Sequence, residues 1–174
     1  YGGIIAQNTF GFSSGDVILF AIVANIVAGV ATIGVGRLDD RFGPRNVIMA
    51  SLGILVVAGV LVFLLHSAGT AAFWVLGLLL SACVGPAQSA ARSFLARLIP
   101  EGQEGEIFGL YATTGRAVSF MAPMMYGVFI YLGTRVVGPG ASYWGILGIV
   151  AVLATGLLLM LRVGDPVADE EPAA

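Results

Sequence analysis

Five apolar stretches, each about twenty residues long, constrain this chain more than any other feature of its sequence. An α-helix rises about 1.5 Å per residue, so each stretch can cross the hydrocarbon core of a bilayer, which is roughly 30 Å thick. Short polar segments separate the stretches, and only the fourth has a charged residue in its interior, Arg116. The crossings are expected at residues 16–36, 46–65, 71–91, 107–131 and 143–161. The sequence therefore predicts an all-α, polytopic transmembrane helix bundle over residues 11–162.

The two ends of the chain depart from this pattern. Residues 1–10 are apolar and lack the charged start of a signal peptide, so we expect them to be the end of a further, truncated transmembrane helix. Residues 163–174 contain four carboxylates and two prolines, and they have too few apolar side chains to form a core. This composition predicts an acidic, disordered tail.

The arginines are distributed unevenly between the two sides of the predicted bundle. Positively charged residues near helix ends tend to stay in the cytoplasm, whereas acidic residues contribute little to orientation. Arg135 is on one side, and the other side has six arginines: Arg37, Arg41, Arg45, Arg92, Arg97 and Arg162. The segments 37–45 and 92–106 and the C-terminal tail are therefore predicted to be cytoplasmic.

Small residues recur at every fourth position on two of the crossings. They are Ala24, Ala28, Thr32 and Gly36 on the first and Gly77, Ser81, Gly85 and Ser89 on the third. Helices associate in lipid through close van der Waals packing, so the two stripes predict helix–helix seams. Pro86 and Pro123 lie inside the third and fourth crossings, where the missing backbone donor permits a kink.

Several classes of function are excluded or disfavoured by what the sequence lacks. Charged residues make up only 10% of the chain and its net charge is −2, so there is no basic patch for nucleic acid. A single cysteine and a single histidine exclude a disulfide framework and a Cys/His metal site. The sequence has no intramembrane aspartate pair, His-Glu metal motif or Ser-His pair. We therefore expect no enzyme, no catalytic residue, no bound metal and no cofactor.

The segment between the first two crossings, GRLDDRFGPR at residues 36–45, is the first of two informative motifs. It resembles the G-x-L-a-D-r-x-G-r-r loop of the major facilitator superfamily of secondary transporters. The sequence departs from that motif at Asp39 and Pro44, and it matches at Gly36, Leu38, Asp40, Arg41, Gly43 and Arg45. The resemblance implies a gating loop in which Arg41 or Arg45 pairs with Asp40. The gate residues are expected to be Gly36, Asp40, Arg41, Gly43 and Arg45.

The second motif is longer. It comprises Gly85-Pro86, Gln88, Arg92-Ser93, Ile99-Pro100, Phe108-Gly109-Leu110-Tyr111 and Gly115-Arg116. It is similar to the superfamily branch that contains the autophagy-related vacuolar amino-acid effluxers and their bacterial relatives, although this chain has Arg116 where the branch has lysine. The resemblance implies the second six-helix half of a twelve-helix major facilitator fold, with its first helix truncated. The missing N-terminal half of the same transporter would be its partner.

Five side chains are candidates for contact with a substrate. A guanidinium inside a bilayer costs at least about 2.5–3.5 kcal/mol on insertion scales, so Arg116 is expected to face a cavity, a ligand or an acidic partner. Gln88 and Arg92 share one helical face, although Arg92 is near enough to the membrane surface to snorkel. Asn25 is a lone amide in mid-helix, suited to an interhelical hydrogen bond or to a substrate. Tyr111 could line the cavity of Arg116 or anchor its helix at the interface.

Two interpretations of function remain open. The leading one is a secondary transporter that moves a small polar solute, by resemblance an amino acid, across a lipid bilayer by alternating access. The alternative is a non-transporting membrane scaffold or helical-bundle interaction protein, in which Arg116 would be unnecessary. In either case we expect a multi-pass integral protein of a bacterial cell membrane, or of the vacuolar membrane if the source is eukaryotic.

Overall fold

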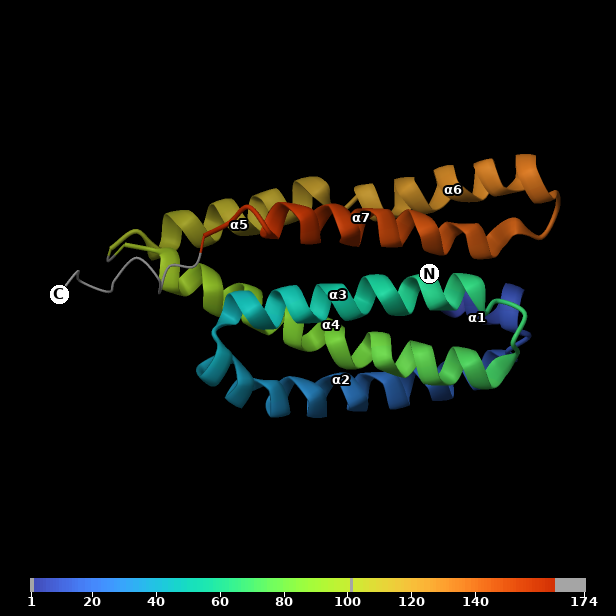
Figure 1. Ribbon diagram of the computed structural model, residues 1–174, viewed down its shortest axis with the longest axis horizontal. Helices are drawn as coiled ribbons and strands as arrows, with labels where there is room; N and C mark the ends of the chain where they lie inside the picture. Colours follow the sequence, from blue (N-terminus) through green and yellow to red (C-terminus); the bar gives the residue numbers. More distant parts are fainter. Residues whose placement is uncertain (1, 101, 165–174) are drawn as a thin grey trace.

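Helices and the turns between them make up the chain in the computed structural model, which describes residues 2–100 and 102–164 (Figure 1). Five segments are long and apolar enough to cross a bilayer, and no strand occurs in the described residues. The predicted all-α bundle is therefore confirmed. The predicted disordered tail falls outside the described residues, except for Val163 and Gly164. The helices are α1 (Gly2–Phe10), α2 (Ser14–Phe42), α3 (Pro44–Leu64), α4 (Thr70–Leu98), α5 (Glu104–Val118), α6 (Met121–Val137) and α7 (Gly145–Met160), with a 3-10 turn, η1 (Ala141–Trp144), before α7.

Successive connections lie at opposite ends of the bundle (Figure 1). The α2–α3 and α4–α5 connections and the end of α7 lie together at one end, called here the arginine-rich end. This end carries Arg41, Arg45, Arg97 and Arg162. The α1–α2, α3–α4 and α6–α7 connections lie at the opposite end, with His66 and Arg135. The structure thus groups the arginines as the sequence predicts.

The connection between α2 and α3 differs from the prediction. The sequence predicts a loop over residues 36–45, and this is wrong, because α2 continues as a helix to Phe42 and only Gly43 separates it from α3. No glycine or proline lies between Gly36 and Gly43, so nothing interrupts the helix there. Gly43 turns the chain with a φ of 81°, and its N–H donates to the Asp39 carbonyl at 3.0 Å. Pro44 then begins α3, where a helix needs no N–H donor.

The hydrogen-bond ladder of the fourth crossing is broken near its middle, although Ser119 and Phe120 keep helical backbone angles. The expected span at residues 107–131 consists of α5 and α6, which are separated by a turn at Ser119 and Phe120. Pro123 causes the break, because it has no N–H to donate to the Ser119 carbonyl one turn earlier. Ser119 instead turns back on α5 and donates to the Arg116 carbonyl, through its N–H at 3.2 Å and its Oγ at 2.7 Å.

The small residues of α2 and α4 allow these helices to pack closely, and the predicted seam is confirmed. A β-carbon at Gly77 would overlap the ring of Phe20, and one at Gly85 would overlap the side chain of Thr32. Thr32 donates its hydroxyl to the carbonyl of Ala28 on its own helix, at 2.7 Å. The hydroxyl can therefore lie in the seam because its hydrogen atom is already bonded.

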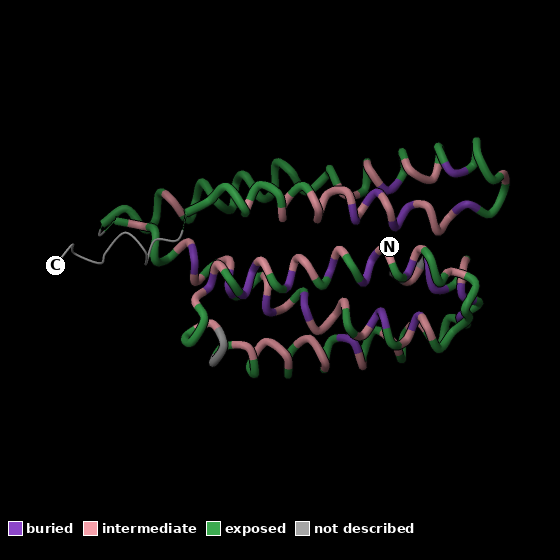
Figure 2. Tube along the Cα trace, in the orientation of Figure 1, coloured by how far each residue is buried: buried purple, intermediate pink, exposed green. Residues whose placement is uncertain are grey.

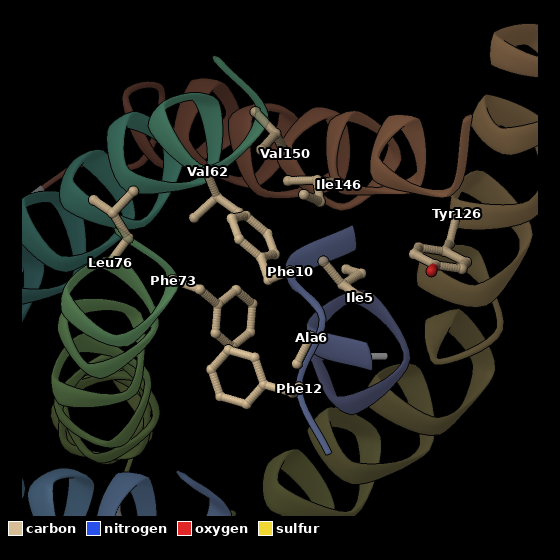
Figure 3. Close-up of a cluster of buried hydrophobic side chains, with 10 residues drawn as sticks. All are labelled: Ile5, Ala6, Phe10, Phe12, Val62, Phe73, Leu76, Tyr126, Ile146 and Val150. Atoms are coloured by element: carbon tan, nitrogen blue, oxygen red, sulfur yellow. The ribbon is translucent and has the colours of Figure 1, made fainter. Parts of the chain in front are cut away.

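The largest buried cluster lies toward the opposite end, where α1 inserts among the other helices (Figure 3). Phe10 and Phe12, at the end of α1 and just after it, pack against Phe73 of α4 with ring centroids 4.9 and 5.2 Å apart. Val62 of α3 and Ile146 of α7 belong to the same cluster. Burial of these rings anchors α1, a short helix that would be marginal alone.

Burial is uneven along the fourth crossing (Figure 2). None of the residues of α5 is buried, and α5 forms no extended interface with another helix of the described chain. By contrast, α6 fits tightly against α7. A β-carbon at Gly148 would overlap the backbone of Met125, and one at Gly145 would overlap the ring of Tyr126. One half of this crossing is therefore fixed to its neighbour, and the other half is not.

Candidate substrate site and gate

Arg116 lies in the last turn of α5, directly before the break. Its side chain is exposed, and its guanidinium has no hydrogen bond or ion pair with residues 2–100 or 102–164. A cation in the last turn of a helix is stabilised by the partial negative charge of the C-terminal carbonyl groups. The position therefore accommodates Arg116 electrostatically while leaving all its N–H donors available for a ligand.

The structure does not enclose Arg116 in a cavity with Tyr111. The two residues are five positions apart, which places them about 140° apart around the helix. Tyr111 is exposed on another face of α5. Thr113 is closer to the Arg116 face, and its hydroxyl donates to the Gly109 carbonyl at 2.8 Å. An apolar cavity of about 210 Å³ lies between α1, α2, α3, α4 and α7, and none of the predicted substrate residues lines it.

Asn25 lies in a groove of about 260 Å³ between α2 and α4, which it shares with Ser81 and Val84. Its Nδ2 donates to the Ala21 carbonyl at 2.8 Å, so the amide bonds within its own helix and not across helices. The carbonyl oxygen of the amide has no hydrogen bond in the described structure. Asn25 therefore presents one acceptor to the groove.

Gln88 and Arg92 lie one turn apart on α4, and both are exposed. The helix continues without interruption to Leu98, so the two side chains share one face as the spacing predicts. Neither side chain bonds to another described residue. The structure thus keeps Gln88 beside Arg92, but Arg116 and Tyr111 are on a different and loosely packed helix.

The arginines of the predicted gate have partners other than Asp40. Arg41 lies over the ring of Phe42, with its Cζ 5.4 Å from the ring centroid. Arg45 donates from Nε to the Val163 carbonyl at 2.8 Å, which ties the start of α3 to the chain after α7. Asp40 is exposed and has no hydrogen bond or ion pair among the described residues. The expected local pair between Asp40 and Arg41 or Arg45 is not formed in this structure.

Sequence reasoning missed Asp39. Its Oδ1 is completely buried without a hydrogen-bond partner in the described structure. It lines a cavity of about 10 Å³, together with Gly36 of α2, Val47 of α3 and Ser89 of α4. A cavity of that size has room for at most about one water molecule. The sequence feature that could have indicated its burial is spacing. Asp39 is seven residues after Thr32, so the two residues share one face of α2 when this helix continues to Phe42.

Comparison of the sequence with known protein families gives one match over almost the whole chain. The family model described as "Vacuole effluxer Atg22 like" matches residues 2–164. The chain belongs to this Atg22-like family. The predicted resemblance to the vacuolar effluxer branch of the major facilitator superfamily is thereby confirmed, and the chain is part of a multi-pass membrane protein.

The relatives of this Atg22-like chain are bacterial and fungal. It is 27% identical over 169 residues to YxiO of Bacillus subtilis, described as an uncharacterized MFS-type transporter; the match covers 94% of this chain and 38% of the relative. It is 27% identical over 145 residues to autophagy-related protein 22 of Cryptococcus neoformans, covering 74% of this chain and 26% of the relative. The chain thus spans well under half the length of these relatives. No solved structure matches it at a significant level.

Proposed function

We propose that this Atg22-like chain forms one half of a secondary transporter that moves a small polar solute by alternating access. The break in the fourth crossing carries the proposal. It brings together the end of α5, the start of α6 and Arg116, about midway along a crossing of 34 residues. Transporters commonly present main-chain polar groups to substrates at discontinuous helices near the bilayer midplane. The names of the relatives support the same activity.

The charges at the break favour an anionic group on the solute. Arg116 contributes a guanidinium, and the first N–H groups of α6 have no side-chain cap. The N-terminus of a helix carries a partial positive charge and binds anions through such free N–H groups. A carboxylate could accept two parallel hydrogen bonds from the planar guanidinium. The proposed solute is therefore an amino acid, bound at Arg116 through its carboxylate.

The remaining candidates suit other parts of the solute or its path. Asn25 has a free carbonyl oxygen in its groove, which could accept a hydrogen bond from an ammonium group. Gln88 and Arg92 lie nearer the arginine-rich end and would line the route between the break and that side of the membrane. Tyr111 is assigned to the wall of the same route. We propose no catalytic step and no cofactor.

The proposed transporter needs a second half. Alternating access requires two bundles that rock around a shared site. The exposure of almost all of α5, including the apolar residues Leu110 and Val118, leaves a helix face without a partner in the described chain. We propose that the N-terminal half of the same protein covers this face.

Uptake of radiolabelled amino acids into proteoliposomes tests the proposal with the full-length protein. Arg116→Ala should abolish uptake without preventing folding, because it removes the charged donor at the break. Arg116→Lys should weaken binding by roughly 1–3 kcal/mol, since a lysine keeps the charge but cannot form the two parallel bonds. Arg135→Ala is the matched control: Arg135 is also exposed, but it lies at the far end of α6 and bonds to Tyr131.

Two results would contradict the assignment. Full uptake by well-folded Arg116→Ala would remove this residue from the site. If Arg116→Ala instead lowers the unfolding temperature, and a second substitution on an acidic partner restores it, Arg116 is a structural counter-ion. Absence of uptake for every amino acid tested, with wild-type protein that is folded and reconstituted, would favour the membrane scaffold.

A further inference from the structure

An apolar groove follows α3 along its outer face, where the helix meets α4. Two adjoining hollows form it, each of about 420 Å³, and they share Ala50 and Ile54. We call it the α3 groove, defined by Asn46, Ala50, Gly53, Ile54, Val57 and Leu61. Asn46, Ala50, Ile54, Val57 and Leu61 follow one another at intervals of three or four, Gly53 lies beside Ile54, and together they form one stripe on the helix. From Asn46 to Leu61 the groove is about 22 Å long.

Small side chains create the hollow. Gly53 has open space where a β-carbon would point, with no atom within 4 Å. The walls are apolar and face outward, because Val57 is 60% exposed and Leu79 of α4 is 41% exposed. A concave apolar surface gives a lipid chain more van der Waals contacts than a flat one.

The two ends of the α3 groove differ in polarity. Leu61 closes it toward the opposite end of the bundle with apolar side chains only. At the arginine-rich end, Asn46 donates to the Phe42 carbonyl at 2.8 Å and keeps its own carbonyl oxygen free. One cation stands close by, because Arg41 lies over the ring of Phe42, which lines the hollow, whereas Arg45 is turned toward the chain after α7 and donates to the Val163 carbonyl.

This polarity matches an amphiphile with an anionic head. The groove carries no charged side chain along its apolar length, so it does not suit a polar solute. One leaflet of a bilayer accounts for about 15 Å of the roughly 30 Å hydrocarbon core. The groove therefore extends through one leaflet from the arginine-rich end and continues past the midplane. Arg41 stands where the headgroups of that leaflet lie.

We propose that the α3 groove is a binding site for an anionic phospholipid. One acyl chain lies along Ala50, Gly53 and Val57, and the phosphate is held by Arg41. The site lies away from Arg116 and does not depend on the transported solute. A lipid held there contacts the ends of both α2 and α3, on either side of the single-residue turn at Gly43.

Native mass spectrometry of the full-length protein in a neutral detergent tests the proposal. Phosphatidylglycerol and phosphatidylcholine with identical acyl chains are the probes, added separately at equal concentration. The wild-type protein should retain phosphatidylglycerol more strongly than phosphatidylcholine. Arg41→Gln should reduce this preference about fivefold, because a cation near the surface contributes roughly that factor, and Arg45→Gln should leave it unchanged, because Arg45 is turned toward the chain after α7.

Filling the groove should remove both lipids. Gly53→Leu places a side chain in the open space, and Ala50→Leu does so from a residue that lines both hollows. Gly156→Leu on α7 is the matched control, since a β-carbon at Gly156 also meets no atom within 4 Å. The expected result is at least tenfold weaker lipid retention for either groove variant, and wild-type retention for the control.

The outcomes separate the alternatives. Equal retention of the two lipids by the wild-type protein, or retention unchanged by both groove variants, would overturn the proposal. If Gly53→Leu instead converts a dimer into a monomer, the groove is an interface with a second copy, and the lipid proposal is wrong. Gly53→Leu and Ala50→Leu fill the groove from different positions. The test therefore needs only one of the two variants to fold.

Discussion

Replacing Gly148 with alanine should destabilise the pairing of α6 with α7, and the structure allows the size of the effect to be worked out. A β-carbon at Gly148 would overlap the carbonyl group of Met125 and the N–H of Tyr126. These are backbone atoms of α6, so they cannot move aside by changing a rotamer. The two helices must separate until these atoms reach ordinary van der Waals contact, and the contacts around them weaken. Overpacking of this kind costs typically about 1–3 kcal/mol.

A second glycine of α7 allows the cost of overpacking to be measured separately. Gly156 also lies within α7, and a β-carbon there meets no atom within 4 Å. Glycine to alanine in a helix interior contributes roughly 1 kcal/mol of stability at either position through backbone propensity. Gly156→Ala should therefore stabilise the protein by about that amount. The difference between the two variants cancels the propensity term and leaves the overpacking cost of about 1–3 kcal/mol.

The measurement is the free energy of unfolding of the full-length protein, from titration of mixed micelles with a denaturing detergent and far-UV circular dichroism. Gly148→Ala should unfold at a lower detergent fraction than Gly156→Ala. Equal unfolding midpoints for the two variants would mean that α6 and α7 are not in backbone contact at Gly148, and the reasoning would fail.

Two further predictions concern orientation and the gate. In a protein with Cys83 replaced by alanine, a cysteine introduced at Ser142 should react with an impermeant reagent from outside the cell, or from the lumen of a vacuole. A cysteine introduced at Gln103 should react only from the cytoplasm. Labelling of the cysteine at position 103 from outside in intact cells would mean that the predicted orientation is reversed. Asp40→Asn should slow conformational exchange while keeping substrate affinity within a few fold, measured as turnover and binding in proteoliposomes, and unchanged turnover would reject the gate role. Asp39→Asn should leave the unfolding temperature unchanged or raise it, because a neutral amide avoids burying a charged oxygen without a partner.

The crossings were predictable because apolar length and helical rise alone determine what can span a bilayer. The seam between α2 and α4 was predictable for a related reason, since small residues at every fourth position are a local pattern with a direct packing consequence. The position at which α2 ends was not predictable, because a segment as highly charged as residues 37–45 is usually assigned to a loop. A helix can extend beyond the bilayer with charged side chains, and only the Gly43-Pro44 pair ends it.

The candidate site was less accessible to sequence reasoning. Arg116 stood out because a charge within an apolar stretch is costly wherever the helix packs. Its surroundings depend on which helices approach α5, and that is a tertiary property that spacing does not contain. Asp39 was overlooked for the same reason, because it is buried only where α2, α3 and α4 meet. The next residue, Asp40, is the one that matches the family motif, and it is exposed.

The division of the fourth crossing has a mechanical consequence. Since α6 is held against α7 by glycine contacts and α5 has no buried residue, motion at Ser119 and Phe120 would move α5 and leave α6 in place. The arm is about 22 Å long, so a rotation of about 10° at the break would displace its far end by about 4 Å. Arg116 is next to the pivot and would hardly shift, whereas Glu104 would sweep across the membrane surface at the arginine-rich end. A small rearrangement around a bound solute would thus be amplified at the membrane surface, without any change in the packing of the other helices.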